Sequence, residues 1–88
     1  MAAVVTRFQV TDQPRWKRMF DTSARERAAV GINGALVFVD GDTPEYMIVI
    51  YQVDDIRRAK AYLTLPRQTD REFEVGVSEM QIWLGVEP

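Results

Sequence analysis

The 88-residue sequence contains no cysteine and no histidine. Disulfide bridges are therefore excluded, and so are metal sites built on thiolate or imidazole ligands. A chain of this length buries only roughly 60–65% of the surface that it exposes when unfolded. Small domains usually compensate with disulfides, metals or oligomerisation. Oligomerisation is the remaining route, and we expect residues 1–88 to form a single domain that associates with itself.

Long apolar runs and an excess of one charge are also missing. No apolar stretch approaches the roughly 20 residues of a membrane-spanning helix, and residues 1–5 are too short, and too soon followed by charge, to be a signal peptide. The formal net charge is −2, with acids and bases mixed along the chain. There is no basic block to neutralise a phosphate backbone. These absences predict a cytoplasmic protein that binds neither nucleic acid nor a membrane.

Apolar patterning predicts four strands, at about residues 4–10, 35–40, 46–53 and 77–84. The first and last runs alternate, whereas the two central runs are apolar throughout. The central strands would therefore place apolar side chains on both faces of a sheet. The segment 40–44, which contains Asp-Gly and a proline, predicts a hairpin between them because glycine accepts the positive φ of a tight turn.

The first helical segment begins after Asp12, with Pro14 in its first turn, where the missing N–H costs nothing. Trp16, Met19 and Phe20 follow at helical spacing and are expected in the core. Residues 21–23 favour a break, with a second short segment over residues 23–30. A left-handed Gly31 is expected to end it.

The second helical segment is capped by Asp54 and Asp55 and is expected to end at Leu65-Pro66. Residues 67–76 are polar and predict at most a short helical turn that carries Phe73. Asn33 lies between two glycines and is expected to be a turn residue with left-handed backbone geometry.

The resulting order, β-α-β-β-α-β, predicts an α+β, ferredoxin-like fold: a four-stranded antiparallel sheet with two helices on one face. The strictly apolar strand positions should face the helices: Val4, Phe8, Val10, Met80, Ile82 and Leu84. The opposite face should then carry Val5, Arg7, Gln9, Ile48, Ile50, Gln52, Gln81 and Trp83. This mixture of apolar groups, one cation, amides and an indole is typical of a small-molecule pocket. A second copy would enclose it; alternatively, this face lies open to water.

Arg7 is the first candidate catalytic residue. A guanidinium in an enclosed cavity needs an anionic partner, and it could hold a substrate carboxylate or a developing enolate. The alternative is an arginine at the rim of the sheet, paired with Glu79 or Glu87 across strands. Tyr62 is the second catalytic candidate, although a tyrosine on a helix is also an ordinary packing residue.

The candidate ligand-binding residues are polar or aromatic side chains of the strands: Gln9, Tyr51, Gln52, Gln81 and Trp83. The three glutamines could fix a carbonyl-rich ligand, although each is ordinary on a sheet. Tyr51 is the other possible proton donor of moderate acidity. Trp83 either stacks on an aromatic ligand or anchors a dimer interface.

Residues 53–66 resemble a pattern of the antibiotic-biosynthesis-type monooxygenases: a tryptophan, acidic residues, a helix, histidine-leucine and a proline. Val53 stands here in the position of the tryptophan, and Tyr62 in that of the histidine. Element order and length over nearly the whole chain are similar to the dimeric α+β barrel superfamily, which includes these monooxygenases and small polyketide cyclases. The resemblance implies a homodimeric α+β barrel with a cavity for a hydrophobic, aromatic or polyketide-like molecule.

Because the chain lacks histidine, the haem ligation and the histidine-dependent chemistry of some members of that superfamily do not apply to it. The resemblance then implies an enzyme without a cofactor, either a cyclase or a monooxygenase, that holds a reactive substrate in one conformation. The alternative is a non-catalytic module of the same fold that binds a small ligand or serves dimerisation.

Overall fold

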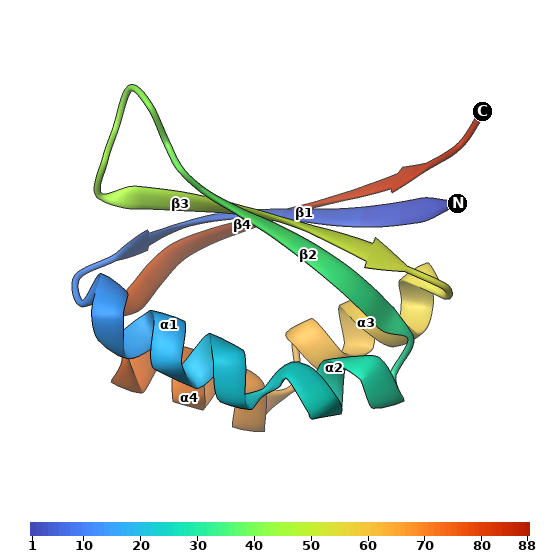
Figure 1. The fold of residues 1–88 in the computed structure, drawn as a ribbon, viewed down its shortest axis with the longest axis horizontal. Coiled ribbons are helices and arrows are strands. Elements are labelled where there is room, and N and C mark those ends of the chain that lie inside the picture. The colour runs from blue at the N-terminus through green and yellow to red at the C-terminus, as the bar shows by residue number, and fades with distance from the viewer.

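The structure, a computed structural model, describes residues 1–88. Four antiparallel strands form one sheet in the order β2-β3-β1-β4. They are β1 (Ala2–Val10), β2 (Ile32–Val39), β3 (Tyr46–Val53) and β4 (Val77–Val86). All helices lie on one face of this sheet (Figure 1), so the predicted ferredoxin-like fold is confirmed.

Each of the two expected helical segments is a pair of short helices. The first pair is α1 (Gln13–Thr22) and α2 (Ala24–Ala29), and the second is α3 (Ile56–Leu63) and α4 (Pro66–Glu74). Asp12 caps α1 by accepting a hydrogen bond from the Arg15 backbone N–H at 3.0 Å. Ser23 separates α1 from α2, as the sequence predicts, and its hydroxyl donates to the Met19 carbonyl at 2.9 Å.

The segment after α3 differs from the sequence prediction. Pro66 does not only follow the end of α3; it also opens α4, because a proline at the first helical position loses no hydrogen bond. The polar residues expected to form at most one helical turn make a nine-residue helix. Phe73 points to solvent with 77% of its surface exposed, while Gln68 and Glu72 are buried, with only 7% of the surface of each exposed. Polar groups therefore occupy the inward face of α4.

Asn33 is not a left-handed turn residue, which corrects the sequence prediction. It lies within β2 at a shift in the register between Ile32 and Gly34, and its φ is not positive. Its side-chain amide donates to the Asp54 carboxylate at 2.6 Å. Asp54 thus ties β2 to the start of α3, while Asp55 caps that helix. The left-handed residue is Gly31, with φ +79°, as expected.

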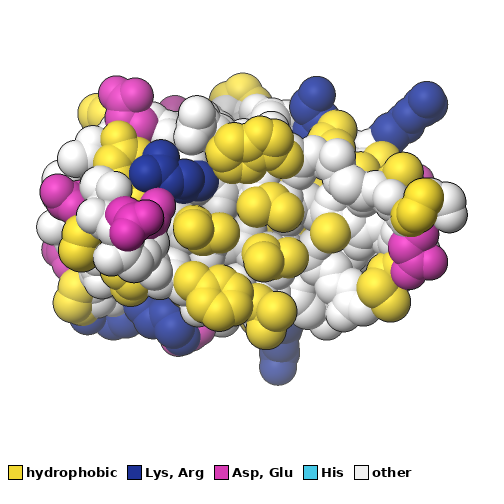
Figure 2. Space-filling view, turned by 90° about the horizontal axis from the view of Figure 1, so that it is seen from above, with side chains coloured by type: hydrophobic (Ala, Val, Ile, Leu, Met, Phe, Trp, Pro, Cys, Tyr) yellow, Lys and Arg dark blue, Asp and Glu magenta, His cyan; other side chains and the backbone are white.

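The two faces of the sheet carry different side chains, as the alternation predicts. Val4, Phe8 and Val49 face the helices and are at most 1% exposed. On the other face, the strand register joins Val5 to Ile50 and Trp83. β2 adds Leu36 and Phe38, which pair with Ile50 and Ile48. These six residues form the open-face patch, the yellow cluster at the centre of Figure 2: Val5, Leu36, Phe38, Ile48, Ile50 and Trp83.

None of the helices combines the length and the hydropathy that crossing a membrane requires.

Gly76, between α4 and β4, has φ +88°, and a Cβ atom there would collide with the Thr11 side chain. We predict that Gly76→Ala lowers the free energy of unfolding by about 2 kcal/mol, because a left-handed alanine is strained and Thr11 must move. Urea unfolding measures the change. Gly41→Ala is the control, because nothing lies within 4 Å of its added Cβ. Equal effects of the two substitutions would contradict the prediction.

Candidate functional site

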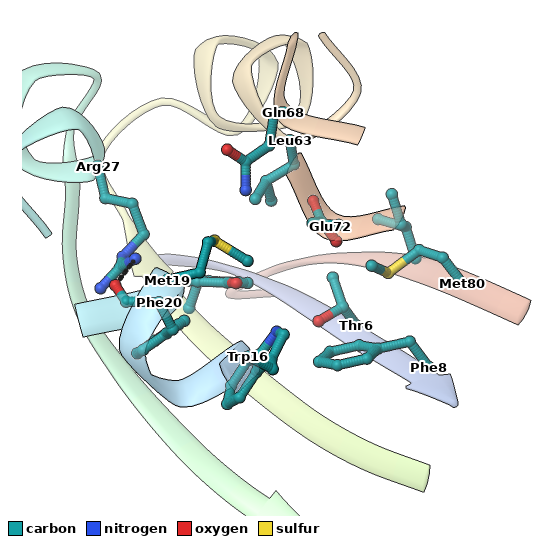
Figure 3. A pocket seen from close by; sticks show the side chains of 12 residues that line it. Thr6, Phe8, Trp16, Met19, Phe20, Arg27, Leu63, Gln68, Glu72 and Met80 are labelled. Carbon is teal, nitrogen blue, oxygen red and sulfur yellow. Dashed lines mark hydrogen bonds between the residues drawn. The ribbon is translucent and has the colours of Figure 1, made fainter. Parts of the chain in front are cut away.

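A small cavity lies between the helix-covered face of the sheet and the helices (Figure 3). Aromatic rings form one wall: Trp16 stacks on Phe20 with ring centroids 4.9 Å apart, and Phe8 lies 5.4 Å from Trp16. Met19 and Met80 are also among the lining side chains. The free volume is about 20 Å³, which is room for about one water molecule. The wall is therefore typical of a site for an aromatic ligand, but its side chains are packed closely.

Arg27 of α2 brings a buried cation to this cavity and is only 9% exposed. One guanidinium nitrogen donates to the Phe20 carbonyl at 2.7 Å, and the guanidinium stacks over the Phe20 ring at 3.8 Å from its centroid. Arg27 takes part in none of the ion pairs of the structure. A buried cation without a carboxylate partner is costly. Arg27 can therefore stabilise an anionic group of a bound molecule.

Glu72 of α4 brings a buried carboxyl group to the same cavity. Burial raises the pKa of Glu72 to about 7, against the opposing effects of a hydrogen bond from Gln68 and the positive charge of Arg71. Near neutral pH this group is thus present in both its protonated and its ionised form. A carboxyl group tuned in this way is suited to accept a proton and give it back.

Two hydroxyl groups complete the polar part of the cavity. Thr6 is buried, and its hydroxyl oxygen has no hydrogen-bond partner, which leaves it free for a ligand. Tyr51 also lines the cavity, and burial, followed by the nearby charge of Glu72, raises its pKa. Tyr51 is therefore a proton-bearing donor at neutral pH. No group of three or more acidic side chains is gathered in a way that could hold a metal ion.

A surface groove adjoins the cavity between α3, α4 and β4. It has a volume of about 280 Å³ and shares Leu63, Glu72, Met80 and Ile82 with the cavity. Met80 reaches both spaces because β4 has a bulge, at which the strand register shifts and Glu79 adopts a φ of +55°. The cavity and the groove are thus neighbours that share part of their lining.

The structure does not bring the sequence-predicted site residues together. Five of them lie on the open face: Arg7, Gln9, Gln52, Gln81 and Trp83. Tyr51 and Tyr62 lie on the helix side of the sheet, where both are buried. The seven therefore cannot form one site within a single chain, and their functional roles stay predictions.

Arg7 has an ionic partner that the sequence reading did not name. Its Nε donates to the Asp40 carboxylate at 3.0 Å, and its guanidinium stacks over the Tyr46 ring at 4.0 Å from the centroid. The prediction that Arg7 pairs with Glu79 or Glu87 is therefore wrong. Asp40 follows β2 in the hairpin, where its backbone N–H donates to the Tyr46 carbonyl of β3, so Arg7 of β1 reaches Asp40 across the Tyr46 side chain.

The hydroxyl of Tyr62 is 3.4 Å from the side-chain oxygen of Gln68, to which it donates. Burial, followed by the charge of Glu26, raises the pKa of Tyr62. Tyr62 does not line the cavity itself, but it contacts Gln68, which does. It is part of the polar surroundings of Glu72.

Sequence reasoning missed Arg27 and Glu72, although a signal for each was present. Arg27 continues the buried stripe of Trp16, Phe20 and Ser23, with successive spacings of four, three and four residues. Glu72 follows Gln68 by four residues, as expected on one helix face. A helical stripe that contains charged residues has the same pattern as a solvated face, so the sequence assigns only its apolar positions to the core.

No family model matches the sequence, and no curated protein sequence matches it. Solved structures match over nearly the whole chain. One antibiotic biosynthesis monooxygenase gives a TM-score of 0.73 at 12% identity, covering 100% of this chain and 99% of its own. SnoaB, a cofactor-independent oxygenase from Streptomyces nogalater, gives a TM-score of 0.72 at 16% identity, and the match covers 99% of this chain and 92% of SnoaB. A dimeric ferredoxin-like protein from an uncultured marine organism gives a TM-score of 0.66 at 6% identity, and the match covers 99% of this chain and 94% of that protein.

The chain has the fold of the antibiotic biosynthesis monooxygenases. The resemblance inferred from residues 53–66 and from the order of elements is thereby confirmed at the level of the fold. At these identities it is the monooxygenase fold alone that the comparison establishes.

The raised pKa of Glu72 predicts a pH-dependent stability. The folded chain holds this proton up to about pH 7, whereas the unfolded chain releases it near pH 4.5. The contribution of Glu72 to stability is therefore greatest below pH 4.5 and declines between pH 4.5 and about 7, by about 3 kcal/mol.

We predict that Glu72→Gln removes most of this decline and is more stable than the wild type at pH 8. Chemical unfolding between pH 4 and pH 8 measures the difference. Glu74→Gln, on the exposed side of the same helix, is the control and should keep the wild-type profile. Parallel profiles for the wild type and Glu72→Gln would contradict the prediction.

Proposed function

We propose that this protein is a cofactor-independent oxygenase that acts on a hydrophobic, hydroxylated aromatic or polyketide-like small molecule. The proposal rests on one observation above all: a carboxyl group with a pKa near 7 and an arginine without a carboxylate partner line the same aromatic cavity. A base and a cation on an apolar wall are what the formation of an enolate or phenolate requires. The shared fold with SnoaB, itself a cofactor-independent oxygenase, supports the same chemistry.

In this mechanism ionised Glu72 removes an acidic proton from a phenol or from a methylene group beside a carbonyl. Arg27 stabilises the resulting oxyanion, and the hydroxyls of Thr6 and Tyr51 donate hydrogen bonds to substrate oxygens. The electron-rich anion passes an electron to dioxygen, and the two radicals then combine. One oxygen atom becomes a new carbonyl of the product, and the other leaves as water with the two hydrogens of the substrate. The balance therefore needs no external reductant.

Substrate access requires side chains to move, because the free volume of the cavity is about 20 Å³. Leu63 and Met80 line both the cavity and the surface groove, and methionine adapts readily to the shape of a ligand. An aromatic ring that displaces these two side chains would lie between Trp16 and Glu72. The groove would hold any part of the molecule that extends beyond the cavity.

The open face has a separate role in the proposal, as the interface of a homodimer. Within the open-face patch, Leu36 is 60% exposed, and Phe38 and Trp83 are each 49% exposed. Such a contiguous apolar surface is unusual on a monomer, and a second copy would cover it. The dimeric ferredoxin-like structural neighbour supports this arrangement. Arg7, Gln9, Gln52 and Gln81 would then line the space between the two sheets, and Trp83 would anchor the contact.

The enzymatic proposal is tested with anthrone, a tricyclic ketone with an acidic methylene group, under air. We predict dioxygen uptake with formation of anthraquinone, at a rate that rises with pH through about 7 as Glu72 loses its proton. Glu72→Gln should lower this rate by about 100-fold or more, because a general base contributes at least that much. An oxygen electrode and product chromatography measure both.

Glu74→Gln is the control for the enzymatic test and should keep the wild-type rate. Dioxygen uptake that is equal in Glu72→Gln and the wild type would refute Glu72 as the base. Consumption of a polyketide-like substrate without dioxygen uptake would refute the oxygenase activity and indicate a cyclase instead. If anthrone and related phenols bind but none of them reacts, the protein is a binding module and the enzymatic proposal fails.

The dimer is tested by Trp83→Glu, which places a charge within the open-face patch. We predict that the dimer dissociation constant rises by about 30-fold or more, because buried aromatic anchors carry much of the energy of such contacts. Sedimentation at micromolar concentration measures the change. Phe73→Glu is the control, because it alters an exposed aromatic residue of α4 on the other side of the sheet. A wild-type chain that sediments as a folded monomer would refute the dimer.

A further inference from the structure

The surface groove between α3, α4 and β4 carries negative charge and no positive charge. Its charged lining residues are Glu72 and Glu79, and no lysine or arginine belongs to its wall. Neither carboxylate takes part in an ion pair of the structure. Glu72 is only 7% exposed, so its ionised form has no cationic partner and little contact with water. The groove can therefore stabilise a positive charge that enters it.

The bulge of β4 brings Glu79 to this groove. Glu79 and Met80 lie at the shift in register, where the two of them stand opposite the single residue Phe8 of β1. In a regular strand, neighbouring residues point to opposite faces of the sheet. At the bulge Glu79 has a φ of +55°, and both residues line the groove. The bulge thus adds a second carboxylate to the groove that Glu72 already lines.

Two hydroxyl groups of the groove use their protons within the protein. Thr64 donates to the Lys60 carbonyl at 2.8 Å, and Thr69 donates to the Pro66 carbonyl at 3.1 Å. A hydroxyl whose proton is engaged in this way offers a ligand only its lone pairs, and an ionised carboxylate likewise only accepts hydrogen bonds. These four side chains are therefore suited to a ligand that donates hydrogen bonds.

The rest of the lining suits an organic ligand. Phe73, with 77% of its surface exposed, belongs to the wall, and the face of an aromatic ring attracts an organic cation. Leu63, Val77 and Ile82 supply apolar surface. The volume of about 280 Å³ is close to the roughly 300 Å³ at which ligand pockets begin. A metal ion fits less well, because no three acidic side chains gather to surround one.

We propose that this groove binds the protonated amine of an organic ligand, with the ammonium group held by Glu79 against the ring of Phe73 and facing Glu72 where the groove meets the cavity. An alkylammonium group brings one positive charge and only donors, which match the acceptors of the groove. As a statement about the substrate, the proposal rests on the proposed function and narrows the substrate to aromatic molecules that carry a basic amino group. A cation in the groove would also favour the ionised form of Glu72 that acts as the base.

The test is a titration of the full chain with three probes that share a phenyl ring: 2-phenylethylammonium, the neutral 2-phenylethanol and the anionic phenylacetate. We predict that the ammonium probe binds about 10-fold more tightly than the alcohol, the effect of roughly one charge-assisted hydrogen bond, and that phenylacetate does not bind. Shifts of the Glu79 and Met80 backbone amide signals in NMR spectra give the dissociation constants. At pH 8 Glu72 is ionised and an alkylamine is protonated.

Glu79→Gln should lower the preference for the ammonium probe over the alcohol by about 5-fold and leave the binding of the alcohol unchanged. Glu74→Gln is the matched control, because it removes the same charge from an exposed position of α4 outside the groove, and it should keep the wild-type preference. Equal binding of the ammonium probe and the alcohol by the wild type would overturn the proposal. Equal losses in the two variants would also overturn it, because the attraction would then come from the net charge of the chain.

The titration and the anthrone assay fail independently, because none of the three probes needs to be oxidised. Tighter binding of the ammonium probe without any oxidation of anthrone would support the groove and refute the oxygenase. Oxidation of anthrone without a preference for the ammonium probe would refute the groove alone.

Discussion

The structure depends on the burial of a polar cluster in the layer between the sheet and the helices. Arg27, Gln68 and Glu72 are each less than 10% exposed, beside a wall of aromatic side chains. Burying such groups is unfavourable unless they are hydrogen-bonded or paired. Part of the cost is offset by the hydrogen bond of Arg27 to the Phe20 carbonyl and by that of Gln68 to Arg71, which is itself paired with Glu26. The cost that is not offset is seen in the raised pKa of Glu72 and in the lack of an acidic partner for Arg27.

These two unmatched groups give the cavity its chemical capacity. A carboxyl group near its midpoint at neutral pH and a desolvated guanidinium would be poor choices for stability alone, since an apolar pair of similar size could fill the space. Functional sites are where such destabilised polar groups are found. The free volume of the cavity is small, and Leu63, Met80 and Glu72 line both the cavity and the adjoining groove.

The two faces of the sheet carry different kinds of side chain. The helix-covered face lines the cavity with its buried polar groups, while the open face carries the apolar patch and the Arg7–Asp40 pair. Strand alternation is the physical reason for this division, because neighbouring residues of β1 point to opposite sides. Arg7 and Thr6 are adjacent in the sequence, yet one lies on the open face and the other lines the cavity.

The sequence by itself determined the order of elements, the β2–β3 hairpin, the break at Ser23 and the side-chain sets of the two sheet faces. These features follow from local chemistry: capping residues, glycine in turns, and apolar periods of two and of three to four residues. Only the tertiary structure decided that Asp40 pairs with Arg7 and that Arg27, Gln68 and Glu72 are buried together. Such contacts join residues far apart in the sequence, 33 positions for Arg7 and Asp40 and 45 for Glu26 and Arg71. A charged residue on a helix carries no local sign of what covers it.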